Sequence, residues 1–123
     1  MIVLKKITKT YRNRKVLDQV SLTIKGGEFV SIVGSSGAGK TTLLHSMIGA
    51  TKPSSGSITV DGVEITKMNS DEIQSYRRSI GIIFQDYKLL PNKTVYENVA
   101  FALEVAGYGR SFIRERTVDA LKL

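Results

Sequence analysis

Apolar residues recur at every second position in two stretches near the beginning of the chain. The first stretch is Ile2–Thr8, and the second is Val16–Ile24. A period of two is typical of a strand that buries one face. We therefore expect two half-buried strands here, the second followed by a tight turn at Lys25–Gly27.

Two other stretches are apolar and β-branched without alternation, namely Phe29–Val33 and Ser79–Phe84. Such runs are typical of parallel strands that are buried on both faces. A third pattern, over Ser57–Ile65, alternates on both sides of an Asp-Gly pair, which predicts a β-hairpin. The chain is thus expected to combine an antiparallel part with a parallel sheet.

Helical periodicity and capping residues predict four helices. The first is Thr42–Gly49, closed by its glycine, and the second runs from Asn69 to about Arg78 with acidic residues in its first turn. The third runs from Val95 to about Ala106, behind a capping box of Thr94 and Glu97. The fourth is the amphipathic segment 111–121.

The loop between the strand at 29–33 and the helix at 42–49 matches the pattern G-x-x-x-x-G-K-[ST] at every fixed position. It consists of Gly34, Ser35, Ser36, Gly37, Ala38, Gly39, Lys40 and Thr41. Glycines let the backbone curl so that successive amides surround a phosphate, and the helix that follows directs its positive end at the same anion. An ordinary glycine turn would need neither the Lys-Thr pair nor this spacing, so the pattern favours a phosphate site.

Composition narrows the classes of protein. The 123 residues make one ordinary domain with 41% hydrophobic and 24% charged residues, no cysteine and a single histidine, His45, which excludes a disulfide scaffold and a thiolate metal site. No apolar run is long enough for a membrane helix and the beginning does not resemble a signal peptide, so we expect a cytoplasmic chain. The net charge of +7 is spread over the sequence, without interleaved aromatics, and indicates solvated surface plus the phosphate site rather than direct nucleic-acid binding.

Two further residues have a functional and a structural interpretation from the sequence alone. Tyr11 lies in a basic turn, where it is either a platform for a purine base or a tyrosine packed on its neighbours. Gln85 follows the apolar run 79–84, at a strand end where ligands of open α/β sheets bind. It could reach Mg²⁺, a water or a γ-phosphate, or it could merely cap the strand.

The sequence resembles the nucleotide-binding subunits of the ATP-binding-cassette (ABC) family over essentially its whole length. Residues 34–42 match that family's Walker A loop, Tyr11 its adenine-stacking aromatic, and Gln85 its Q-loop glutamine. The resemblance implies an α/β P-loop NTPase core with an antiparallel β subdomain in residues 1–86, and the start of a helical subdomain in residues 87–123. It also implies that residues 34–42, including Thr42, and Tyr11 bind ATP, with Thr41 and Gln85 as ligands of Mg²⁺.

The family's signature sequence, Walker B carboxylates and switch histidine have no counterpart in these residues, and the last helix has no stop signal at Leu123. The chain therefore looks like the amino-terminal part of an ATPase subunit and is expected to bind nucleotide without hydrolysing it. The resemblance implies that the parent protein is a homodimeric ATPase, peripheral on the cytoplasmic face of the membrane.

Residues 87–105 look most like family members that act in cell division with an integral membrane partner. Leu89, Leu90 and Tyr96 are expected to contact that partner, unless they pack against other parts of the parent protein. ATPases of lipoprotein or macrolide exporters, and soluble cassettes acting on nucleic acid or the ribosome, are the alternatives.

Overall fold

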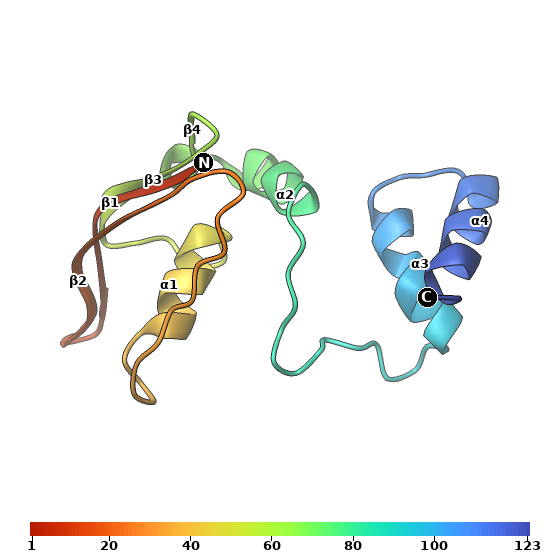
Figure 1. Ribbon diagram of the computed structural model, residues 1–123, viewed down its shortest axis with the longest axis horizontal. Coiled ribbons are helices and arrows are strands. Elements are labelled where there is room, and N and C mark those ends of the chain that lie inside the picture. The colour runs from red at the N-terminus through yellow and green to blue at the C-terminus, as the bar shows by residue number, and fades with distance from the viewer. The chain divides into compact units, whose positions relative to one another are not determined.

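The computed structural model describes residues 1–123, and its backbone contacts divide the chain into two compact units, Met1–Ile80 and Gly81–Leu123 (Figure 1). The first unit contains a four-stranded sheet and two α-helices, and the second contains a helical hairpin. The sequence places the boundary between the core with its β subdomain and the helical subdomain at residues 86 and 87. That boundary stays a prediction.

The sheet of the first unit is antiparallel throughout, in the order β2-β1-β3-β4. Its strands are β1 (Ile2–Tyr11), β2 (Arg14–Ile24), β3 (Ser55–Val60) and β4 (Val63–Glu64). The two strands predicted near the beginning of the chain are thus confirmed, with β1 three residues longer than expected. The predicted hairpin is confirmed as well, because Asp61 and Gly62 both have positive φ, 47° and 84°, as a type I′ turn requires.

Irregular pairing between β1 and β2 decides which side chains of β1 are buried. Leu4 and Ile7 are both fully buried, although a strict period of two would direct Lys6 inward. The register shifts between Leu4 and Ile7, where Lys6 has a left-handed φ of 49°, so the alternation restarts at Ile7. The amide of Lys6 donates to Ser21 Oγ at 2.9 Å, which satisfies a backbone group at this bulge.

Helix α1 (Lys40–Met47) packs on the sheet and contributes Leu43 to the core. It begins two residues before the predicted start and is followed, as expected, by a glycine in the left-handed region, Gly49 with φ 69°. The other buried core residues come from the strands and the short 3-10 helix η1 (Ile65–Lys67); they are Leu4, Ile7, Leu17, Ile58 and Ile65.

Helix α2 (Ser70–Arg78) begins at the predicted cap. The Asn69 side chain accepts from the amides of Asp71 and Glu72, and the Glu72 carboxylate accepts from the Asn69 amide at 2.8 Å. This reciprocal pairing satisfies amide donors that a helix start would otherwise leave free.

The two strands predicted at Phe29–Val33 and Ser79–Phe84 are wrong for this chain. Neither segment forms a strand, and Phe29 and Ile83 expose 96% and 89% of their surface. A parallel strand exists only through ladder hydrogen bonds to its neighbours, and no segment of these 123 residues pairs with either run. Apolar β-branched composition alone does not supply those bonds.

The second unit is built from α3 (Val95–Val105) and α4 (Arg110–Ala120), both close to their predicted bounds and separated by the predicted glycine break. Ala100, Ile113 and Thr117 are buried between them, and the rings of Tyr108 and Phe112 stack with centroids 4.8 Å apart. None of the helices of the chain has the length and the apolar composition that crossing a membrane requires.

The capping box of α3 gives a prediction for pH dependence. Hydrogen bonds from the Thr94 amide, the Lys93 ammonium and the Thr94 hydroxyl lower the pKa of Glu97 from 4.5 to about 2. Because the pKa of Glu97 is depressed in the folded chain, its ionised carboxylate stabilises the fold. This stabilisation is complete above pH 4.5 and is lost as the pH falls toward 2. We expect an NMR titration of the Glu97 carboxyl to have its midpoint near 2, and to move upward in Thr94→Val. A wild-type midpoint near 4.5 would contradict the capping box.

Candidate phosphate-binding site

The loop that precedes α1 is folded by its glycines. Gly37 and Gly39 have left-handed φ values of 76° and 95°, and the Ala38 amide donates to the Ser35 carbonyl at 3.3 Å. Residues with side chains rarely adopt these backbone angles, so the local sequence is what permits the turn. The strand that was expected to lead into this loop is absent, whereas the loop and the helix after it are formed.

Gly39 attaches the loop to the sheet. A Cβ at this position would lie 2.8 Å from the Val16 carbonyl oxygen and 3.1 Å from Leu17 Cδ2, both on β2. The backbone of β2 and the start of α1 are therefore in direct contact, and only glycine allows that approach. Val16 was not singled out by the sequence, because nothing in its local pattern marks it as a neighbour of the loop.

The first turn of α1 offers free backbone donors. The earliest helical hydrogen bond runs from the Leu43 amide to the Gly39 carbonyl at 2.8 Å, and no side chain caps the helix. The amides of Lys40, Thr41 and Thr42 consequently have no acceptor within the protein. Together with the partial positive charge at a helix start, three such amides are suited to an anion.

The ammonium group of Lys40 lies within the loop. Its Nζ donates to the carbonyl oxygens of Gly34 and Ser35, each at 2.7 Å, which bridges the two ends of the loop. It forms no ion pair with a carboxylate. Its full positive charge is therefore balanced only by carbonyl dipoles, and a phosphate could replace these as a stronger acceptor.

The loop and the first turn of α1 also carry hydroxyl groups. Ser35, Ser36 and Thr41 are exposed, and Thr42 is half-buried. A threonine hydroxyl directly after the lysine is a neutral oxygen ligand of the kind Mg²⁺ accepts alongside phosphate oxygens and waters. The donor set of free amides, one ammonium and hydroxyls fits a magnesium-bound polyphosphate. The first unit thus supports a phosphate-binding role for residues 34–42.

Tyr11 is the last residue of β1 and pairs with the beginning of β2, the strand that contacts the loop. It pairs with Arg14 on β2, two residues before the Val16 carbonyl against which Gly39 packs. Its side chain is 46% exposed, and Lys9 Nζ lies 5.0 Å from the ring centroid. The ring is therefore available for stacking, although one face already has a cation over it.

Gln85 lies in the second unit, exposed at the start of a turn over residues 85–88. Its role as a ligand of Mg²⁺ stays a prediction. No cluster of three or more His, Cys, Asp or Glu side chains forms a metal site in the chain. Thr41 and Gln85 remain the only residues for which a metal role is predicted.

The apolar loop before α3, residues 87–93, is held in part by hydrogen bonds to that helix. The Leu90 amide donates to Asn98 Oδ1 at 2.7 Å, and Asn98 Nδ2 donates to the Leu90 carbonyl at 3.2 Å. Leu90 is half-buried, whereas Leu89 is 68% exposed and Tyr96 is 38% exposed. Of the three residues expected at a partner contact, Leu89 and Tyr96 are thus the accessible ones.

Comparisons with known proteins agree with this geometry. Residues 17–122 match the protein family described as ABC transporter. The chain is 48% identical over 126 residues to the methionine import ATP-binding protein MetN of Carboxydothermus hydrogenoformans, and 46% identical over 124 residues to the cell division ATP-binding protein FtsE of Bacillus subtilis. Both alignments cover 100% of this chain, but only 37% of MetN and 54% of FtsE.

Solved structures give the same result for the fold. The dimeric structure of MJ0796, a bacterial ABC transporter cassette, matches with a TM-score of 0.91 and 38% identity, covering 99% of this chain and 56% of that one. CbiO1 from Clostridium perfringens, part of the transporter complex cbiONQ, matches with a TM-score of 0.82 and 34% identity, covering 98% and 49%. The chain therefore has the fold of the corresponding part of ABC cassettes, and it spans about half the length of these structures.

Proposed function

This chain belongs to the ABC transporter family, and we propose that its residues 34–42 bind the phosphates of ATP within the ATP-binding subunit of a membrane complex. The observation that carries the proposal is that one loop and the helix turn after it hold both an ammonium group, Lys40 Nζ bonded to the Gly34 and Ser35 carbonyls, and the free first-turn amides of α1. A chain that spans 54% or less of these relatives supplies one part of such a subunit.

Each group of the loop has a proposed role. The amides of Lys40, Thr41 and Thr42 donate to phosphate oxygens, and the Lys40 ammonium neutralises their charge. The Thr41 hydroxyl and the Gln85 side-chain oxygen are the proposed ligands of Mg²⁺. When bound, this ion offsets negative charge on the β- and γ-phosphates. The chain's own groups thus bind and orient the nucleotide.

These 123 residues are proposed to hold ATP without turning it over. None of them matches the carboxylates with which the family activates water, and phosphoryl transfer needs a positioned nucleophile as well as charge neutralisation. We expect phosphate release by the purified chain to stay at the background rate of a protein-free control. Turnover that persists after repurification, and that disappears in Lys40→Ala, would contradict this view.

Stacking of adenine on Tyr11 gives a further prediction. Base–aromatic stacking is worth about 1–3 kcal/mol, so Tyr11→Ala is expected to weaken ATP binding by about tenfold or more, whereas Tyr11→Phe retains it. Inorganic tripolyphosphate has no base and should bind equally to wild type and to Tyr11→Ala. Calorimetric titration with both ligands separates stacking from a change in the loop. Equal losses for ATP and tripolyphosphate would argue against the base contact.

For the parent protein we propose a function of the FtsE type, in which ATP hydrolysis drives cell division and cell-wall remodelling through an FtsX-like integral membrane partner. Support comes from the resemblance of residues 87–105, and from the exposure of Leu89 in the loop before α3 and of Tyr96 in the first turn of α3. The subunit is proposed to act as a homodimer at the cytoplasmic face of the membrane, without direct contact to nucleic acid.

A second candidate is methionine import, which the 48% identity to MetN favours. Expressing the full-length protein in bacteria that lack FtsE or MetN distinguishes the two. Rescue of the division defect would support the first proposal, and rescue of methionine uptake the second. Rescue of neither, with recovery of RNA or of an exporter component in a pull-down, would instead support the soluble or exporter alternatives.

A further inference from the structure

The C-terminal end of α1 is capped by two side chains from α2. Tyr76 donates its hydroxyl to the Met47 carbonyl at 2.7 Å. Arg77 donates Nε to the Ile48 carbonyl at 3.2 Å and Nη2 to the Gly49 carbonyl at 2.5 Å. These three consecutive carbonyls lie at the end of a helix, where no backbone amide reaches them. The side chains of α2 thus satisfy the end of the helix whose beginning forms the phosphate loop.

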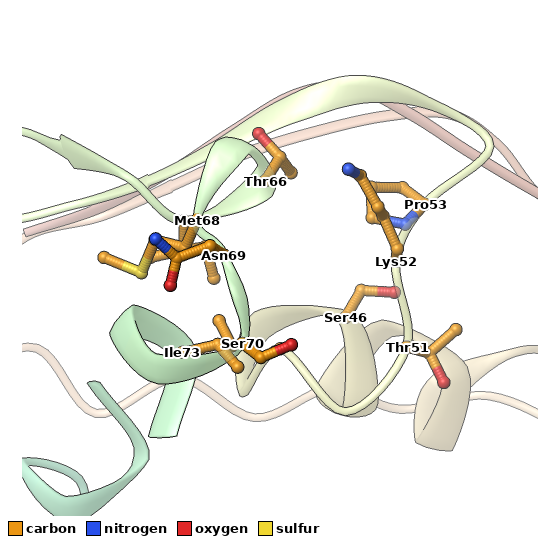
Figure 2. A pocket seen from close by; sticks show the side chains of 11 residues that line it. Ser46, Thr51, Lys52, Pro53, Thr66, Met68, Asn69, Ser70 and Ile73 are labelled. Carbon is orange, nitrogen blue, oxygen red and sulfur yellow. The ribbon is translucent and has the colours of Figure 1, made fainter. Parts of the chain in front are cut away.

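The junction between the C-terminal end of α1 and helix α2 also includes one tight apolar contact. Gly49 has a left-handed φ of 69°, and a Cβ there would lie 2.3 Å from Ile73 Cδ1 of α2. Beside this contact a cavity of about 150 Å³ remains (Figure 2). Figure 2 shows Ile73 and Ser70 on one side of it, and Ser46 and Thr51 on the other. The three hydrogen bonds and the Gly49–Ile73 contact together hold the end of α1 against α2.

The electrostatics of the junction support its stability. Burial raises the pKa of Tyr76, and the negative charge of Asp61 adds to the shift, so the hydroxyl stays protonated and able to donate. Arg77 forms no ion pair, which leaves its guanidinium to the carbonyls of α1. A cation at a helix C-terminus is favourable because it faces the negative end of the helix dipole.

We propose that Arg77 is a positioning residue of the phosphate site, acting through α1. The helix has eight residues and is therefore only about 12 Å long, so a shift at its capped end also displaces the amides of Lys40, Thr41 and Thr42. The hydrogen bonds of Arg77 go to the Ile48 and Gly49 carbonyls and not to the loop residues, so its proposed action is to fix the helix. The proposal rests on the proposed function of residues 34–42 as a nucleotide site.

The test compares Arg77→Ala with the control Arg78→Ala. In the native chain the Arg78 side chain donates a hydrogen bond only to Ser75, in its own helix. In the 123-residue chain, Arg77→Ala is expected to raise the Kd for Mg·ATP about tenfold, at a temperature where both variants are folded. It should also shift the amide NMR resonances of Lys40 and Thr41 without nucleotide. Arg77→Lys should recover part of the affinity, because an ammonium supplies charge and one donor, and Arg78→Ala should match wild type.

Three results would be decisive against the proposal or its premise. A loss of thermal stability in Arg77→Ala with unchanged Kd and unchanged loop resonances would mean that Arg77 only stabilises the unit, and the proposal fails. Equal effects of Arg77→Ala and Arg78→Ala would also overturn it. If wild type binds no nucleotide, the proposed function fails, while the loop resonances still decide whether Arg77 positions the loop.

Discussion

Replacing Lys40 with alanine is expected to weaken binding of Mg·ATP to this chain by about tenfold to a hundredfold. The estimate follows from the loss of one hydrogen bond to a charged group, worth about 1.5–3 kcal/mol. The side chain also bridges the carbonyls of Gly34 and Ser35, so its removal frees the loop ends as well. Both consequences act in the same direction. Titration calorimetry with Mg·ATP measures the change directly.

Two variants make this measurement specific. Lys5→Ala removes the same charge from an exposed position on β1 that forms no ion pair, so it controls for net charge and should bind like wild type. Lys40→Met keeps most of the side-chain volume and should bind as weakly as Lys40→Ala. Equal heats for wild type and Lys40→Ala would remove the nucleotide-binding proposal altogether.

The second large effect concerns stability. Gly56→Ala is expected to destabilise the first unit by about 2–5 kcal/mol, from left-handed backbone strain and overpacking together. Gly56 has φ +92°, and a Cβ there would lie 2.5 Å from the Lys6 carbonyl oxygen and 2.6 Å from that of Lys5. These are backbone atoms of the β1 bulge, so they cannot rotate away. Urea unfolding followed on core methyl groups such as those of Ile58 gives the free energy.

Gly62→Ala is the matched control for that experiment. Gly62 has a similar φ of +84°, but a Cβ there would have open space around it. Its substitution should cost only the left-handed strain, about 1–2 kcal/mol. The difference between the two variants then measures the close approach of β3 to the bulge. Equal destabilisation would mean that the two strands do not meet as described.

Local chemistry made much of this fold predictable. The hairpin at 57–65 follows from an Asp-Gly pair that takes positive φ, and α2 and α3 begin at capping boxes whose partners are three residues apart. The glycines and the lysine of the phosphate loop likewise lie close together in the sequence. Features that depend on neighbours in sequence were therefore predicted with nearly the right bounds.

The two buried strands were predicted wrongly because composition alone does not form a strand. Phe29–Val33 has the composition of a central strand, but a ladder needs a second backbone, and no segment of these residues pairs with this run. The roles of Tyr11 and Gln85 were left open by spacing alone, and their assignment came from resemblance to the family.

The sequence by itself determined the local features, namely which residues form turns, which residues begin helices, and that residues 34–41 form a glycine-rich loop before a helix. Tertiary structure alone decided that Gly39 packs on Val16, that Lys6 forms a bulge that returns Ile7 to the core, and that Arg77 caps α1. The physical reason is the range of the interactions. Backbone angles and caps depend on residues within one turn of each other, whereas these contacts join segments that are distant in the chain or depend on strand pairing.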